Sequence, residues 1–190
     1  MTRATYFTAT TLDGFIADEH DSLAWLFEQQ TDEGGPAGYD AFIAGIGAMA
    51  MGATTYAWLG DHLAGTGEEW PYDMPCWVFT HRDFDKLGED VRFVSGSVAE
   101  HRAAIEESAG DRGVWVVGGG DLAGQFADAG FLDQLVLALA PVTLGSGRPL
   151  FPRQHDLELV ELGRNGDFLM ATYDVVGPRG RDRAPAQNTS

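Results

Sequence analysis

One short segment limits what this chain can fold into more than any other. Residues 114–117 read V-W-V-V, which is typical of a buried strand, and three consecutive glycines follow at 118–120. A helix-forming stretch begins at Asp121. Glycines let the backbone turn sharply or approach a ligand, and the free N–H groups at a helix start favour an anion. The segment predicts a strand-to-helix corner that either cradles a phosphate or is a tight turn without a ligand.

Strand-like and helix-like segments alternate around this corner. That order predicts an α/β fold with a mostly parallel sheet, flanked by helices and closed by an antiparallel C-terminal hairpin. The second helix should have Thr54 or the residue before it as its N-cap, and the S-V-A-E run at 97–100 predicts a capping box. Strands are expected at residues 2–11, 48–51, 75–80, 91–94, 114–117 and 132–140, helices at 39–44, 54–63, 97–109 and 122–129, and the hairpin at 157–163 and 167–176.

The length of 190 residues suits one domain with a full hydrophobic core. We expect this domain at residues 1–177 and a disordered tail at 178–190, where the composition becomes polar and rich in arginine and proline. Residues 18–38 form a long acidic connection with an apolar anchor, and loops of that length are often functional.

The charge excludes one class of partner. Twelve Lys and Arg against 29 Asp and Glu give a net charge of −17, so nucleic acid would be repelled. An anionic cofactor would meet the same field, and its site must depend on backbone N–H groups and a few placed cations.

Other functions are excluded by residue type. Cys76 is the single cysteine and lies in an apolar run, which predicts a small buried side chain and rules out a disulfide framework. The histidines lack metal-ligand spacing, so no metal is expected. No signal peptide and no apolar run long enough to span a membrane are present, which predicts a cytoplasmic protein that does not contact membranes.

The glycine triplet is one of three similar corners. Gly52 separates a strand from a helix that starts with Thr54 and Thr55, and another strand ends at Thr80, followed by His81 and Arg82. Ligands of open α/β sheets bind outside the carboxyl ends of the strands. We therefore expect the three corners to meet around one extended, phosphate-bearing molecule.

In its order of motifs the sequence resembles the dihydrofolate-reductase-like superfamily. It is most similar to the C-terminal reductase domain of bifunctional riboflavin-biosynthesis enzymes and its stand-alone bacterial relatives. The resemblance covers about residues 4 to 175 and implies the three-layer fold of that superfamily. The segments that carry it are 11–17 (T-L-D-G-F-I-A), 51–56 (M-G-A-T-T-Y), 116–120 (V-V-G-G-G) and 140–151 (A-P-V-T-L-G-S-G-R-P-L-F).

The resemblance implies NADPH as the cofactor. In the family, the glycine run and the following helix start hold the pyrophosphate, and a Gly-Arg-x-Thr corner contacts the pyrophosphate and the 2′-phosphate. Here Ala53 replaces the arginine, so either other side chains hold the 2′-phosphate or the preference for NADPH is reduced. We expect the first. The implied cofactor residues are Gly52, Ala53, Thr54, Thr55, Thr80, His81, Arg82, Gly118, Gly119, Gly120, Asp121 and Leu122.

On the substrate side, the resemblance places Asp13 and Trp25 beside the nicotinamide and a heterocycle. Each has an alternative role, Asp13 as a turn former and Trp25 as a hydrophobic anchor. Arg148 is a candidate for a substrate phosphate or carboxylate, or a solvated loop arginine. Asp40 is a candidate proton donor if it lies partly buried in the pocket, and otherwise caps the helix near Tyr39. The catalytic candidates are thus Asp13, Trp25 and Asp40.

These residues predict an NADPH-dependent reductase of a pyrimidine- or pteridine-like heterocycle, similar to the ribosylamino-pyrimidine reductase of riboflavin synthesis. One alternative is dihydrofolate reductase, although none of the nearby acids Asp32, Glu33 and Asp40 has the expected spacing before Gly52. Another is a nucleotide-binding protein without turnover. The family also suggests a homodimer that pairs through residues 132–140 or the final hairpin.

Overall fold

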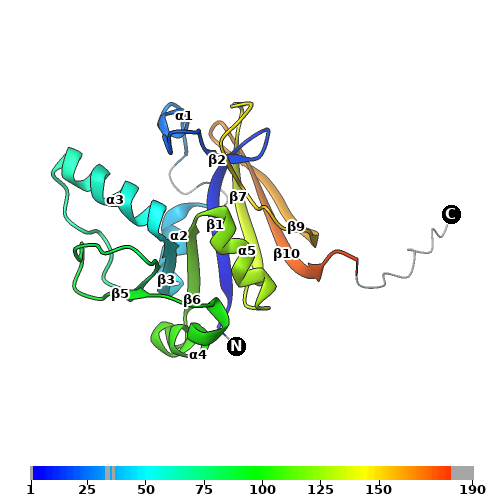
Figure 1. Cartoon of the computed structure of the whole chain (residues 1–190). Coiled ribbons are helices and arrows are strands. Elements are labelled where there is room, and N and C mark those ends of the chain that lie inside the picture. Colours follow the sequence, from blue (N-terminus) through cyan, green and yellow to red (C-terminus); the bar gives the residue numbers. More distant parts are fainter. Residues whose placement is uncertain (1, 33–34, 36, 181–190) are drawn as a thin grey trace.

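The computed structural model describes residues 2–32, 35 and 37–180, and its centre is an eight-stranded sheet of order β5-β4-β3-β6-β1-β7-β10-β9 (Figure 1). A second sheet pairs β2 with β8. The strands are β1 (Ala4–Thr11), β2 (Phe15–Ala17), β3 (Ile46–Gly52), β4 (Cys76–Phe79), β5 (Val91–Val94), β6 (Gly113–Gly118), β7 (Gln134–Ala140), β8 (Arg148–Pro149), β9 (His155–Asn165) and β10 (Phe168–Pro178). The helices are α1 (Ala24–Phe27), α2 (Tyr39–Ala44), α3 (Ala53–Thr66), α4 (Val98–Ala109) and α5 (Gly120–Asp128).

The predicted mixed sheet is confirmed. All pairings among β5, β4, β3, β6, β1 and β7 are parallel, whereas β10 runs antiparallel to both β7 and β9. β10 continues to Pro178, and the amide of Arg179 donates a hydrogen bond to the carbonyl of Gln154 at 2.9 Å. Most of the expected tail, residues 181–190, lies outside the described part of the chain.

Helices cover both faces of the sheet, which gives three layers. Ile105 of α4 and Phe126 of α5 are fully buried in one core cluster, and Tyr56 of α3 belongs to the cluster on the other face. In β6, Val114 and Val116 point into the first cluster and Trp115 into the second. Burying each such side chain contributes about 1.5–3 kcal/mol, so the apolar run of β6 is explained by packing on both faces.

Two helix starts differ from the sequence-based expectation. α3 begins at Ala53 with Gly52 as N-cap, so the assignment of the cap to Thr54 or its predecessor was wrong. α5 begins at Gly120 with Gly119 as N-cap, two residues before the expected start. Neither helix has a side-chain cap. The first-turn N–H groups of both helices are therefore available to a ligand rather than to the protein's own side chains.

Three further local predictions are corrected or refined. Ser97 is the N-cap of α4 but makes no side-chain capping bond, so the capping box is not formed. The strand β7 of the 132–140 segment lies between β1 and β10, so both of its edges are already paired and neither can add a strand of a partner subunit. Cys76 is fully buried, as expected, and burial raises the pKa of its thiol to about 12.

The small β2–β8 sheet was not predicted. It joins the segment after β1 to the segment after β7, and the amide of Leu150 donates to the carbonyl of Gly14 at 2.9 Å. Gly147 has a φ of +151°, and a Cβ there would lie 2.2 Å from the carbonyl oxygen of Ala17. This close approach requires glycine and fixes the position of Arg148 at the end of the main sheet.

Candidate functional site

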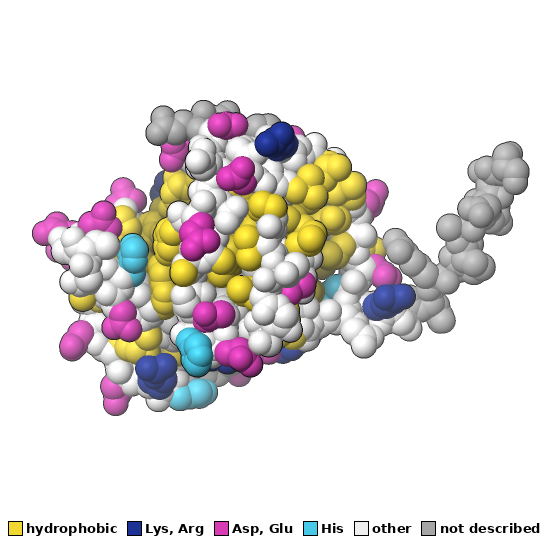
Figure 2. Space-filling view, turned by 90° about the horizontal axis from the view of Figure 1, so that it is seen from above, with side chains coloured by type: hydrophobic (Ala, Val, Ile, Leu, Met, Phe, Trp, Pro, Cys, Tyr) yellow, Lys and Arg dark blue, Asp and Glu magenta, His cyan; other side chains and the backbone are white. Residues whose placement is uncertain are grey.

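A cavity of about 560 Å³ opens at the carboxyl ends of the parallel strands. Figure 2 views the molecule from this end and shows an apolar area surrounded by acidic side chains, with few basic ones. Two of the three predicted corners meet here. Ten predicted site residues line the cavity: Gly52, Ala53, Thr54, Thr55, Gly118, Gly119, Gly120, Asp121, Leu122 and Arg148.

The glycine triplet forms one wall by close backbone approach. A Cβ at Gly120 would lie 2.2 Å from the carbonyl oxygen of Pro149 and 2.4 Å from that of Leu150, so only glycine fits. Gly118 has a φ of +158°, and the peptide bond to Gly119 is cis. The uncapped start of α5 directs its first amides at the cavity, which is the arrangement that binds phosphate groups.

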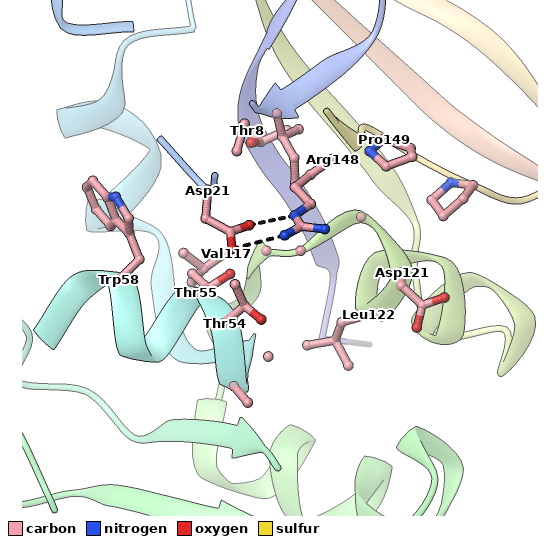
Figure 3. Close-up of a pocket in the computed structure, with 18 of the residues that line it drawn as sticks. Thr8, Asp21, Thr54, Thr55, Trp58, Val117, Asp121, Leu122, Arg148 and Pro149 are labelled. Carbon is pink, nitrogen blue, oxygen red and sulfur yellow. Dashed lines mark hydrogen bonds and ion pairs between the residues drawn. The ribbon is translucent and has the colours of Figure 1, made fainter. Parts of the chain in front are cut away.

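The start of α3 forms the adjoining wall with side chains. Thr54 and Thr55 lie at the cavity in the first turn of this helix (Figure 3). The Thr55 hydroxyl lies 3.2 Å from where a Cβ of Gly118 would be, so the two corners are in contact. Hydroxyl groups and uncapped helix starts thus lie side by side in one cavity.

The third corner lies beside the cavity rather than in it. Phe79 lines the cavity, whereas Thr80, His81 and Arg82 do not. The Arg82 amide donates to the Thr80 hydroxyl at 2.8 Å, and the Arg82 guanidinium lies 4.8 Å from the Phe84 ring centre. Arg82 is exposed, and its guanidinium lies over Phe84 rather than in the cavity.

Arg148 lies in the cavity but already has a partner. Its guanidinium donates two hydrogen bonds to the carboxylate of Asp21, at 2.6 and 3.1 Å (Figure 3). The pKa of Arg148 is raised by this hydrogen bond and by the charge of Asp21, with further contributions from Asp18 and Glu19. Asp21 was not among the predicted site residues.

Asp121 also has internal partners. It accepts a hydrogen bond from Gln125 at 2.8 Å and one from Arg153 at 2.8 Å, and these bonds lower the pKa of its carboxyl. Arg153 also contacts Asp128 at 2.9 Å and packs against Gly124, where a Cβ would lie 2.6 Å from its Cγ. Arg153 therefore links the segment after β8 to both the first turn and the last residue of α5.

Asp13 is not among the residues that line the cavity. Its carboxylate accepts hydrogen bonds from the Thr11 hydroxyl and from the amides of Leu144 and Gly145, the last at 2.7 Å. The bond from Thr11, followed by that from Gly145, lowers the pKa of Asp13. These contacts are those of a turn former that joins two loops, which was the alternative considered for Asp13.

Trp25 and Asp40 are not brought to the cavity either. Trp25 is buried among Ala140, Phe168 and Met170, as a hydrophobic anchor for its loop would be. Asp40 is exposed in the first turn of α2, whose N-cap is Gly38. Asp40 is thus neither buried in the pocket nor the helix cap. Asp32 is bound to the hairpin turn at Asn165 and Gly166, and Glu33 lies outside the described residues.

Several cavity residues were missed by sequence reasoning. Trp58 follows Thr54 by four residues on the same helix, so it lies on the same face and this spacing could have identified it. Ile16 lies in the three-residue strand β2, and Asp21 and Leu23 belong to the loop that follows, which has no recognisable pattern. The full set of missed lining residues is Thr8, Ile16, Ala17, Asp21, Leu23, Trp58, Phe79, Val117, Gln125, Pro149 and Pro152.

The described part of the chain shows neither a metal-binding cluster nor a helix that could span a membrane. Within residues 2–32, 35 and 37–180, no group of three or more His, Cys, Asp or Glu side chains is placed to hold a metal ion. Among the helices in that part of the chain, none has the length and apolar character needed to cross a membrane.

A three-layer α/β fold with a glycine-walled cavity at its strand ends defines a dihydrofolate-reductase-like protein. Residues 3–166 match the model of the RibD C-terminal domain, and the chain belongs to that family. It is 32% identical over 146 residues to the uncharacterized protein YwjB of Bacillus subtilis, a match that covers 76% of this chain and 80% of YwjB.

Solved structures show the same fold. A putative riboflavin biosynthesis protein from Shewanella sp. PV-4 matches with a TM-score of 0.75 and 23% identity, over 91% of this chain and 98% of that one. The deaminase/5-amino-6-(5-phosphoribosylamino)uracil reductase of Thermotoga maritima matches with a TM-score of 0.62 and 17% identity, over 92% of this chain and 56% of that one. A dihydrofolate reductase from Enterococcus faecalis in complex with NADP(H) matches with a TM-score of 0.56 and 14% identity, over 92% of this chain and 96% of that one.

Proposed function

We propose that the protein is an NADPH-dependent reductase of a pyrimidine- or pteridine-like heterocycle. The observation that carries the proposal is the cavity between the two uncapped helix starts, in a chain of the RibD C-terminal domain family. The start of α5 has no side-chain cap, and at its N-cap Gly119 a Cβ would meet only Ile16 at 3.8 Å, so the backbone there fits a pyrophosphate that approaches it closely. Gly118, Gly119, Gly120, Asp121 and Leu122 would hold that group, and Thr54 and Thr55 would face it.

When bound, the nicotinamide supplies the hydride. This chain's residues would orient the ligands and exclude water. Ile16, Leu23 and Trp58 form apolar walls near the strand ends, and such walls strengthen the electrostatic contacts within the site. The proposal assigns the 2′-phosphate to His81 and Arg82, which lie next to the lining residue Phe79, once Arg82 leaves the Phe84 ring.

Titration of NADPH and, separately, NADH by fluorescence tests this proposal. We expect wild type to bind both and Arg82→Ala to weaken NADPH about tenfold, because one charge-assisted phosphate contact is lost, with little effect on NADH. Arg92→Ala is a matched control, since Arg92 also lies over an aromatic ring but outside the cavity. No binding of either nucleotide by wild type would reject the reductase.

The other two functions separate in the same experiment. A nucleotide-binding protein without turnover would bind NADPH but would not oxidise it when either a dihydropterin or a pyrimidine is added. Dihydrofolate reduction lacks support in the described residues, because Asp32 and Asp40 lie outside the cavity and the only carboxylates that line it are Asp21 and Asp121. Turnover of dihydrofolate at a rate above that of the pyrimidine would reverse this ranking.

For a partner we propose a second copy of the chain, bound through β9. This edge strand carries Leu157, Leu159 and Leu162 on one face, with exposed fractions of 36, 52 and 59%. An antiparallel two-fold pairing that sets Leu159 of one copy against Leu162 of the other keeps all three leucines on the same face. Light scattering should give twice 20.5 kDa for wild type and 20.5 kDa for Leu159→Lys. A wild-type monomer would reject the dimer.

A further inference from the structure

The cavity offers a bound substrate phosphate little positive charge. Arg148 belongs to β8, which packs against the start of α5 at Gly120, and Asp21 points at it from the loop before α1 (Figure 3). In the described lining, the charged side chains are Asp21, Asp121 and Arg148, so carboxylates exceed cations. A phosphate on the substrate could therefore find a side-chain cation in this lining only at Arg148.

This one cation of the described lining is already bound to a carboxylate. Asp21 takes two hydrogen bonds from Arg148, in the fork geometry that a phosphate would otherwise use. The carbonyl of Glu19 lies 3.4 Å from the same guanidinium. The turn also brings the carboxylates of Asp18 and Glu19 close enough to interact with Arg148.

The position of Asp21 is built by the backbone of its turn. The carboxylate of Asp18 accepts hydrogen bonds from the amides of His20 and Ser22, both at 2.8 Å, and the Asp18 amide donates to the carbonyl of Ser22. Asp21 has a φ of +63°, which is uncommon for a residue other than glycine. The turn therefore presents Asp21 to the cavity in a fixed way, while the close contact at Gly147 fixes the strand of Arg148.

A phosphate that replaced Asp21 on Arg148 would remain beside three carboxylates. The displaced Asp21 side chain stays on its turn, and Asp18 and Glu19 do not move away with it. The side chains of Arg148 and Asp21 are 52% and 34% exposed, so solvent and salt weaken this repulsion, and it acts mainly at contact distance. The lining also suits a neutral planar group, since Trp58 stacks on His62 with ring centres 5.1 Å apart and adds a flat apolar wall.

We propose that the substrate of this reductase is a planar heterocycle without a phosphate group, and that Asp21 is the residue that determines this specificity by occupying Arg148. The inference rests on the proposed function. It separates this chain from the reductase of Thermotoga maritima, whose name states a phosphoribosyl substrate. It also assigns Arg148 a role other than holding a substrate phosphate.

The test compares two ligands that differ by one phosphate. These are 5-amino-6-(5-phosphoribosylamino)uracil and the same compound after phosphatase treatment, each titrated calorimetrically into the complex with NADP+, which cannot donate a hydride. We expect wild type to bind the dephosphorylated compound about tenfold more tightly, and Asp21→Asn to lose or reverse this preference, because it frees Arg148. Asp111→Asn removes one exposed charge outside the cavity and should behave as wild type.

A second readout does not depend on the reductase proposal. The Arg148 Nε–H signal in an NMR spectrum, identified by its loss in Arg148→Lys, is followed during titration with inorganic phosphate. The signal should not respond in wild type and should shift in Asp21→Asn. A wild-type response as strong as that of the variant, or tighter wild-type binding of the phosphorylated ligand, would overturn the inference. Failure to bind any nucleotide would instead reject the proposed function and leave this second result valid.

Discussion

The two strand-to-helix corners of the cavity look alike in sequence but differ in what they require. In the β6–α5 corner, Gly120 is pressed against backbone carbonyls, so a Cβ there would lie 2.2 Å from Pro149. In the β3–α3 corner, a Cβ at Gly52 would lie 3.9 Å from its nearest neighbours, which is ordinary contact. The first corner needs glycine for packing, and the second needs only its free amides and its threonines.

This difference indicates a division of roles. The β6–α5 corner presents a bare backbone held by the β8 segment, so it suits a ligand group that comes close to the main chain. The β3–α3 corner presents Thr54 and Thr55 as side chains and has Ala53 where the family resemblance implies an arginine. We therefore expect contacts at the second corner to tune the affinity for a ligand that the first corner positions.

The largest expected effect comes from Gly120→Ala. The added methyl group meets two backbone carbonyl oxygens that cannot rotate away, so the corner or the β8 segment must shift. We expect a loss of about 1–3 kcal/mol in the free energy of unfolding, as for an overpacked core position. NADPH binding should be lost as well. Urea unfolding and NADPH fluorescence measure the two effects.

Gly52→Ala is the matched control for that substitution. It adds the same methyl group at the N-cap of the other corner, one helix position before the counterpart of Gly120, where the backbone is extended and space is available. We expect a change in stability below about 0.5 kcal/mol, as for an unstrained substitution, and retained NADPH binding. Equal losses in the two variants would show that the corners do not differ in the way described.

The sequence predicted the two corners because their signals are local. A β-branched strand, glycines and a helix start within about ten residues determine the β6–α5 turn, and alternation of elements determines the parallel sheet. The helix starts were misplaced because threonine and aspartate are favoured caps, whereas here glycine occupies both cap positions. A ligand that uses the first-turn amides would compete with a capping side chain.

The pairing of Asp21 with Arg148 was not predictable in the same way. Asp21 and Arg148 are 127 residues apart, and they meet because two- and three-residue strands, β8 and β2, pair across the chain. Strands that short carry no periodicity. Asp13 and Trp25 were placed at the site by the family resemblance, yet neither lines the cavity in this chain. Their assignment as catalytic residues stays a prediction.

Ala53→Arg would sharpen the comparison by adding charge to the β3–α3 corner. A guanidinium at this lining position can reach a phosphate of the cofactor, so NADPH should bind about tenfold more tightly. NADH should gain less, and added salt should reduce the gain. Ala53→Gln provides length without charge and is the control. An equal gain for NADH and NADPH would show that the new contact does not involve the 2′-phosphate.

Asp121→Asn has the smallest expected effect and tests the charge at the β6–α5 corner. The bonds from Gln125 and Arg153 lower the pKa of Asp121, so its stabilising contribution is present above the unfolded-state pKa and is lost as pH falls through the folded-state pKa. The side chain is 64% exposed, and the effect at neutral pH should be below about 1 kcal/mol. The difference in unfolding free energy between wild type and variant should therefore vanish in acid.

The same variant reports on the ligand. A carboxylate at the start of α5 stabilises the helix but repels a pyrophosphate bound there, so Asp121→Asn should tighten NADPH binding about twofold at low salt while it weakens the fold. Asp111→Asn changes the net charge equally and lies away from the cavity. If the two variants bind NADPH alike, the pyrophosphate does not lie at the start of α5. The β6–α5 corner, where packing requires glycine, would then not be the corner that positions the cofactor.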